Sequence, residues 1–265
     1  MRTSTHAVLV ILGTILTAST QQPFILRSNY KGLNGVLPSA QIFASGLNRA
    51  VYFHEQAVAV VDFKRNNEIH NCDIVEGYEP KEIQEILRNL SASLRPTEVS
   101  FDQMTSLMYR CEEFDRLQPR LSGQSATAKG TFEKANEFGA NALNLLSGIL
   151  PGTKWCGTGD VAQDYHDLGP EVEIDRCCRT HDLCPVKIRA HRTRYNLTNY
   201  SLYSKSHCAC DIALHQCLKN VASPTAKLMG TLYFNVAKVQ CVDDVPSRIH
   251  HGTSQKRFSS TGLTF

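Results

Sequence analysis

The stretch Cys177-Cys178-Arg179-Thr180-His181-Asp182-Leu183-Cys184 decides how the C-terminal part of this chain folds. Within it, Cys177, His181 and Cys184 stand at positions i, i+4 and i+7. This spacing places the three side chains on one face of a helix, which we expect over 175–189. The two cysteines of that face are then about 10 Å apart along the helix axis.

A second helix with the same cysteine spacing is expected over 204–221. In two antiparallel helices in register, the numbers of facing residues have a constant sum. Cys177 with Cys217 gives the same sum as Cys184 with Cys210. The spacing therefore predicts two disulfides that clamp an antiparallel helix pair.

The histidine of this face lies between the two predicted bridges. An imidazole titrates near neutral pH and suits general-base catalysis, provided that another group holds its tautomer. Asp211, at the start of the second helix, is the candidate for that role. Asp182 follows His181 directly and points about 100° away around the helix, so it could serve a different partner, such as a metal ion.

The segment Trp155-Cys156-Gly157-Thr158-Gly159 offers the rest of a metal site. Alternating glycines allow a loop to bend so that its carbonyl oxygens converge. Oxygen ligands in a flexible loop suit calcium, which takes 6–8 oxygens. A Cys156–Cys178 bridge could bring this loop beside Asp182.

The strings WCGTG, CCRTHDLC and CACD, in this order, resemble the bee-venom (group III) type of secreted phospholipase A2. The resemblance extends over about 149–241. It implies a mainly α, disulfide-rich catalytic domain over 149–242, with two antiparallel helices clamped by disulfides, a calcium loop and a small β element.

The resemblance also assigns roles to residues. His181 would be the general base, with Asp211 as its partner and Tyr233 hydrogen-bonded to Asp211. One Ca²⁺ would be bound by the Asp182 carboxylate and by the backbone carbonyls of Trp155, Gly157 and Gly159, and the Gly157 N–H would serve the oxyanion. The implied disulfides are Cys156–Cys178, Cys177–Cys217, Cys184–Cys210 and Cys208–Cys241.

The activity implied is hydrolysis of the sn-2 ester of glycerophospholipids at a membrane or micelle surface. Arg189, Arg192 and Arg194 either contact anionic lipid or belong to an ordinary solvated loop. The apolar group just before the calcium loop either lines the lipid channel, faces the membrane or packs in the core: Leu145, Leu146, Ile149 and Leu150. The chain departs from the resemblance in having no cysteine beyond Cys241. We expect its polar C-terminal segment, 243–265, to be a flexible tail.

The N-terminus has the pattern of a signal peptide over 1–20: a basic start, a short apolar run and small residues. The run is too short to span a bilayer. We therefore expect a secreted, extracellular protein whose disulfides persist, and the sequons at Asn89, Asn196 and Asn199 are compatible with that route.

The region 21–120 is expected to be α+β. A strand is expected over 50–63, where β-branched and aromatic residues are frequent, and helices are expected over 80–90 and 101–114 from the spacing of apolar residues. Its cysteines, Cys72 and Cys111, are expected to pair. This region is either a pro-segment or an accessory domain, and 121–148 is expected to be a linker or lead-in helix.

Two other classes of protein are weighed against the enzyme. A zinc-binding module could use Cys177, Cys178, His181 and Cys184. A catalytically silent protein that binds lipid or a receptor could use the same scaffold. The formal net charge of +3, without basic runs, argues against nucleic-acid binding.

Overall fold

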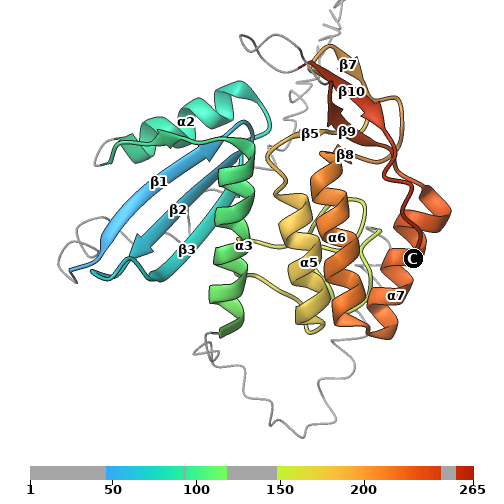
Figure 1. Cartoon of the computed structure of the whole chain (residues 1–265), viewed down its shortest axis with the longest axis horizontal. Coiled ribbons are helices and arrows are strands. Elements are labelled where there is room, and N and C mark those ends of the chain that lie inside the picture. Colours follow the sequence, from blue (N-terminus) through green and yellow to red (C-terminus); the bar gives the residue numbers. More distant parts are fainter. Residues whose placement is uncertain (1–45, 92–93, 118–147, 246–254) are drawn as a thin grey trace, which may run out of the picture.

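The computed structural model describes residues 46–91, 94–117, 148–245 and 255–265. Two groups of elements lie side by side (Figure 1). The N-terminal unit, residues 46–117, holds a four-stranded sheet and two helices. The C-terminal unit, residues 148–245 and 255–265, holds the disulfide-rich helices and several short strands. The expected signal peptide and linker lie outside the described residues.

The sheet of the N-terminal unit starts with a hairpin. Strand β1 (Asn48–His54) pairs antiparallel with β2 (Ala57–Phe63), and β2 pairs with β3 (Ile69–Glu76). The short β4 (Thr97–Glu98) completes the order β3-β2-β1-β4. The single strand expected over 50–63 is wrong, because Glu55 adopts a left-handed φ of 50° and turns the chain.

Both faces of this sheet are covered. Along β2, Val58 and Val60 pack with Ile86 of helix α2 (Pro80–Ser91). The alternate residues Ala59 and Val61 face the other way, toward helix α3 (Phe101–Leu117) and the C-terminal unit. The two helices occupy the ranges for which apolar spacing predicts helix. The Cys72–Cys111 disulfide joins β3 to α3.

Two helices, α5 (Val172–Asp182) and α6 (Cys208–Val221), form the centre of the C-terminal unit. The disulfides Cys177–Cys217 and Cys184–Cys210 join them in the antiparallel register expected above. Both helices are shorter than expected. Helix α5 ends at Asp182, since the coming Pro185 has no N–H for another helical turn.

The start of α6 has an equally local cause. The His207 imidazole accepts a hydrogen bond from the Ala209 N–H and so caps the helix. The preceding Lys205–Ser206 forms strand β8, which pairs with β5 (Lys187–Ile188). A further small hairpin joins β6 (Thr193–Arg194) and β7 (Leu197–Thr198).

The chain ends on a second pair of helical segments and a hairpin. Helix α7 (Pro224–Gly230) continues into a π-helical turn, η1 (Thr231–Ala237), and β9 (Cys241–Asp244) pairs with β10 (Lys256–Ser259). The expected flexible tail is therefore wrong for residues 255–265. Phe265 lies against Gly230 and the His215 ring, which gives this polar segment an apolar anchor.

The two units share one apolar core. It includes Ala59 and Met104 of the N-terminal unit together with Trp155 and Leu214 of the C-terminal unit. Arg179 of α5, with a fully buried side chain, donates hydrogen bonds to Asp115 of α3 and to the Tyr165 carbonyl. Among the described helices, none is long and apolar enough to cross a membrane.

Candidate active site

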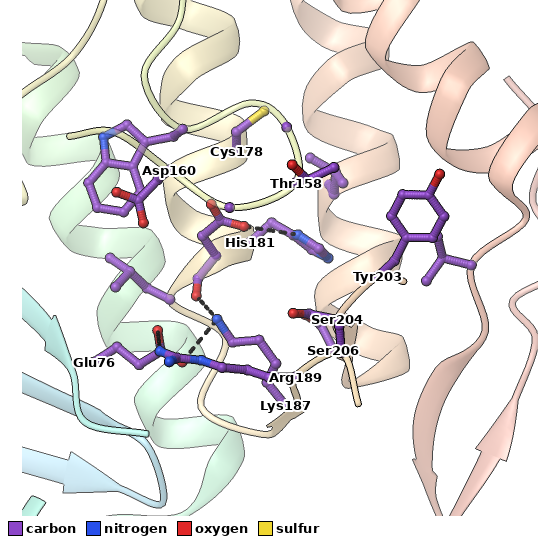
Figure 2. Close-up of a pocket in the computed structure, with 18 of the residues that line it drawn as sticks. Glu76, Thr158, Asp160, Cys178, His181, Lys187, Arg189, Tyr203, Ser204 and Ser206 are labelled. Atoms are coloured by element: carbon purple, nitrogen blue, oxygen red, sulfur yellow. Dashed lines mark hydrogen bonds and ion pairs between the residues drawn. The ribbon is translucent and has the colours of Figure 1, made fainter. Parts of the chain in front are cut away.

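A cleft of about 810 Å³ lies at the seam between the two units (Figure 2). Its lining brings together His181 and Asp182 at the end of α5, the loop around Gly157, and Tyr233 of η1. Residues far apart in the sequence therefore meet in one cavity that is large enough for a small organic ligand.

His181 and Tyr233, which line the cleft, form a hydrogen-bonded triad with the buried Asp211. His181 Nε2 lies 2.8 Å from Asp211 Oδ1, and the Tyr233 hydroxyl donates to the same carboxylate oxygen over 3.0 Å. The Asp211 side chain is 1% exposed and that of His181 is 10% exposed. Disulfides on both sides of His181 hold the two helices, and with them this geometry.

The hydrogen bond to Asp211 indicates which ring nitrogen of His181 carries the proton. A carboxylate only accepts hydrogen bonds, so Nε2 carries the proton and Nδ1 keeps its lone pair. Burial, followed by the Asp211 charge, raises the pKa of Tyr233 far above its usual range. Tyr233 thus stays protonated and supports Asp211 as a donor. The described geometry can therefore accept a proton at His181 Nδ1.

The glycine loop approaches the same point. Cys156 forms a disulfide with Cys178, which ties the loop to α5. A Cβ on Gly157 would lie 2.2 Å from the Gly148 carbonyl oxygen, so only glycine fits there. Gly159 has a φ of +133°, which side chains rarely adopt. Trp155, Gly157, Gly159 and Asp182 all line the cleft.

The chemistry of this donor set fits a hard cation. One carboxylate and several backbone carbonyls are oxygen ligands of the kind that calcium prefers. In the described part of the chain, no group of three or more His, Cys, Asp and Glu side chains is placed to hold a metal ion. A site in this cleft would therefore depend on backbone carbonyls, with Asp182 as its carboxylate.

Sequence reasoning missed the residue that anchors the loop. Asp175, which is fully buried in the first turn of α5, accepts backbone N–H groups of Lys154, Trp155 and Gly169. Burial raises the pKa of Asp175, while these N–H donors oppose that shift. An acidic residue in the first turn of the active helix was the available signal, because such residues bind free N–H groups near helix N-termini.

The N-terminal unit also supplies part of the cleft, which the sequence did not indicate. Ile74, Glu76 and Tyr78 line it from the end of β3 and the segment that follows. Glu76 forms ion pairs with Lys187 at 3.0 Å and with Arg189 at 3.0 Å.

Several proteins named phospholipase A2 are similar to this chain. A family model described as phospholipase A2 matches residues 149–245. The acidic phospholipase A2 PA4 of Heloderma suspectum is 44% identical over 95 residues, which cover 36% of this chain and 67% of the relative. The phospholipase A2 of Bombus terrestris is 44% identical over 94 residues, covering 35% of this chain and 69% of the relative.

The chain belongs to the phospholipase A2 family, whose members are carboxylic ester hydrolases. It is also 40% identical over 122 residues to the human group 3 secretory phospholipase A2, which covers 46% of this chain and 22% of that relative. These relatives place it with the bee-venom (group III) type. The N-terminal unit lies outside the segment that the family model matches.

The structure of this phospholipase A2 family member excludes the zinc-binding alternative. All ten cysteines are in disulfides, with Cys208–Cys241 and Cys72–Cys111 as well as the three bridges around α5. A zinc site made of Cys177, Cys178 and Cys184 thiolates is therefore excluded.

The sequons differ in their access to solvent. Asn89 and Asn196 are exposed. Asn199 is fully buried, and its amide donates hydrogen bonds to the carbonyls of Ile188 and Tyr203. A glycan at Asn199 is therefore incompatible with this fold.

Proposed function

We propose that this protein is a secreted, calcium-dependent phospholipase A2 that hydrolyses the sn-2 ester of glycerophospholipids to a lysophospholipid and a free fatty acid. The observation that carries this proposal is the hydrogen bond between His181 and the buried Asp211, with His181 lining one cleft together with Asp182 and the glycine loop. Five disulfides, and a human relative that is named secretory, support the extracellular location.

In the proposed reaction, His181 acts as the general base. Its Nδ1 removes a proton from a water molecule, and the oxygen of that water attacks the ester carbonyl. Asp211 stabilises the imidazolium that forms, with Tyr233 as its hydrogen-bond donor. His181 then returns the proton to the leaving alkoxide of the lysophospholipid.

The proposed calcium ligands are the carboxylate of Asp182 and the backbone carbonyls of Trp155, Gly157 and Gly159. When bound there, Ca²⁺ would supply positive charge that polarises the ester carbonyl and attracts the substrate phosphate. The backbone N–H of Gly157 is proposed to donate a hydrogen bond to the oxyanion.

The substrate requires that the cleft open toward lipid, and exposed apolar residues at its edge support this. Leu202, Leu232 and Val236 line the cleft and are 75%, 41% and 69% exposed. We add them to the candidates for contact with a membrane or micelle. Of the candidates inferred from the sequence, Ile149 is buried and Arg194 is paired with Glu55 of the N-terminal unit. Arg192 is exposed and lines the cleft, whereas Leu145 and Leu146 lie outside the described residues.

The test is to incubate the protein with vesicles whose phospholipids carry different labelled acyl chains at sn-1 and sn-2. We expect release of the sn-2 chain alone, and loss of release when a chelator is added. Release from sn-1, or release that resists the chelator, would contradict the proposal. A disulfide-intact protein that binds vesicles without any release would instead be a catalytically silent lipid-binding protein.

A further inference from the structure

Lys187 occupies an unusual position for a cation. It follows helix α5 by five residues, is 6% exposed, and lines the cleft with His181 (Figure 2). Asp182 lines the same cleft. Its ammonium group donates a hydrogen bond to the Asp182 carbonyl and forms an ion pair with Glu76. An ammonium has three N–H donors, so these two contacts leave one for another acceptor.

The N-terminal unit holds the backbone on which Lys187 lies. Gln56, which is fully buried, donates its backbone N–H to the Pro185 carbonyl over 3.1 Å. Its side-chain amide donates to the Lys187 carbonyl over 2.8 Å. Two hydrogen bonds from a buried residue fix this segment of the C-terminal unit against the turn between β1 and β2.

The N-terminal unit also positions the side chains of Lys187 and Arg189. Glu76, at the end of β3, pairs with both Lys187 and Arg189, so two cations share one carboxylate. The Arg189 guanidinium also stacks 4.4 Å from the centre of the Tyr78 ring. Burial alone would raise the pKa of Glu76, but the two cations lower it and keep the carboxylate charged.

A pair of positioned cations in a partly buried cleft attracts an anion, because charge interactions are stronger there than in water. The proposed substrate brings one such anion, its phosphodiester, next to the scissile ester. Arginine and lysine are the side chains that usually bind phosphate oxygens.

We propose that Lys187 and Arg189, held by Glu76 and Gln56, form a subsite for the phosphate group of the phospholipid. The inference rests on the proposed function. It implies that the N-terminal unit contributes to substrate binding by holding Lys187 and Arg189 in place. Under this proposal Glu76 is a positioning residue. The alternative, that the N-terminal unit masks these cations as an inhibitory pro-segment, predicts opposite effects of substitutions at Glu76.

The first experiment is calorimetric titration of the full chain with dodecylphosphocholine below its micelle concentration, in calcium buffer. We expect Lys187→Met to weaken this binding about tenfold or more, as for the loss of a charged hydrogen bond, and Lys187→Arg to weaken it less. Dodecyl maltoside has the same alkyl chain but no phosphate. Its affinity for both variants should equal its affinity for the unchanged protein. Equal loss for both ligands, or no loss for either, would overturn the subsite.

Lys205→Met is the matched control. Lys205 is 7% exposed, belongs to the strand that pairs with β5, and bonds to Gln240 outside the cleft. Its removal should leave binding of both ligands unchanged. Inorganic phosphate is titrated in parallel. If Lys187→Met abolishes binding of inorganic phosphate but leaves dodecylphosphocholine unaffected, the site takes free phosphate and the lipid proposal is wrong.

The second experiment measures phospholipid hydrolysis by Glu76→Gln, with thermal unfolding to show that the variant is folded. A positioning role predicts a higher KM with a smaller change in kcat. Faster hydrolysis would show that Glu76 masks the cations and would overturn the inference. If the unchanged protein hydrolyses no phospholipid, the proposed function fails, while the binding data still decide whether the subsite exists.

Discussion

The guanidinium of Arg179 and the carboxylate of Asp115 are 2.9 Å apart, although 64 residues separate them in the chain. Arg179 lies on the active helix α5 two residues before His181, and Asp115 lies on α3 of the N-terminal unit. The same guanidinium contacts Glu112 and stacks 3.9 Å from the centre of the Tyr165 ring. The helix that carries the proposed base is therefore fixed to the N-terminal unit by a buried ion-pair network.

Replacement of Arg179 should consequently destabilise the whole molecule. Arg179→Met leaves the buried Glu112 without this cation, and the loss should be about 3 kcal/mol in the free energy of unfolding. Chemical denaturation followed by fluorescence and by circular dichroism measures it. Because the core is shared, both probes should report one transition. Separate transitions for the two units would show that the interface contributes little.

Loss of Asp211 should reduce kcat more than loss of the Tyr233 hydroxyl, because Asp211 contacts His181 directly. Asp211→Asn removes the carboxylate that holds the tautomer, and should reduce kcat about 10²-fold or more. Tyr233→Phe removes one hydrogen bond and keeps the ring, so the reduction should be about tenfold or less. Steady-state kinetics measure both. Equal effects of the two substitutions would contradict this order.

The last residue of the chain should contribute to stability. Phe265 packs on Gly230 and near Phe234, and its backbone exchanges two hydrogen bonds of 2.9 Å with the Asn235 side chain. Phe265→Ala should lower the free energy of unfolding by about 2 kcal/mol. The conservative Phe265→Leu should lower it less. An unchanged melting temperature for Phe265→Ala would mean that this contact is not formed in solution.

A buried acid should make stability depend on pH. Burial, followed by the nearby Asp164, raises the pKa of Asp73 to about 7. A raised pKa means that the folded protein prefers the neutral carboxyl, so its contribution is complete below pH 4 and is lost as the pH rises toward 7. Asp73→Asn cannot ionise and should lack this loss. Melting temperatures of both proteins between pH 4 and 8 provide the comparison, and parallel curves would contradict it.

Much of the proposed site could be inferred from the sequence because its geometry is local. Cys177, His181 and Cys184 share a helix face by spacing alone, and the matching spacing of Cys210 and Cys217 gives the register of the helix pair. These signals survive even though α5 ends at Asp182, since Cys184 lies just beyond the last turn.

The remainder depends on contacts that no periodicity reports. Glu76 and Lys187 are far apart in the sequence, and neither has a neighbour that marks it as part of a cleft. The C-terminal segment is polar, so its composition suggested disorder, whereas its pairing with β9 and the contacts of Phe265 order residues 255–265. Both the ion pair and the order of the C-terminal segment arise from contacts between residues distant in the sequence, which only the structure identifies.

The central claim is tested most directly by substitution of the proposed base. The measurement is the calcium-dependent release of sn-2 fatty acid from phospholipid vesicles by the unchanged protein, by His181→Gln, and by His70→Gln as a control on an exposed histidine of the N-terminal unit. The account predicts that His181→Gln lowers kcat about 10²- to 10⁴-fold, while His70→Gln retains full activity. Full calcium-dependent activity in folded His181→Gln would contradict the account.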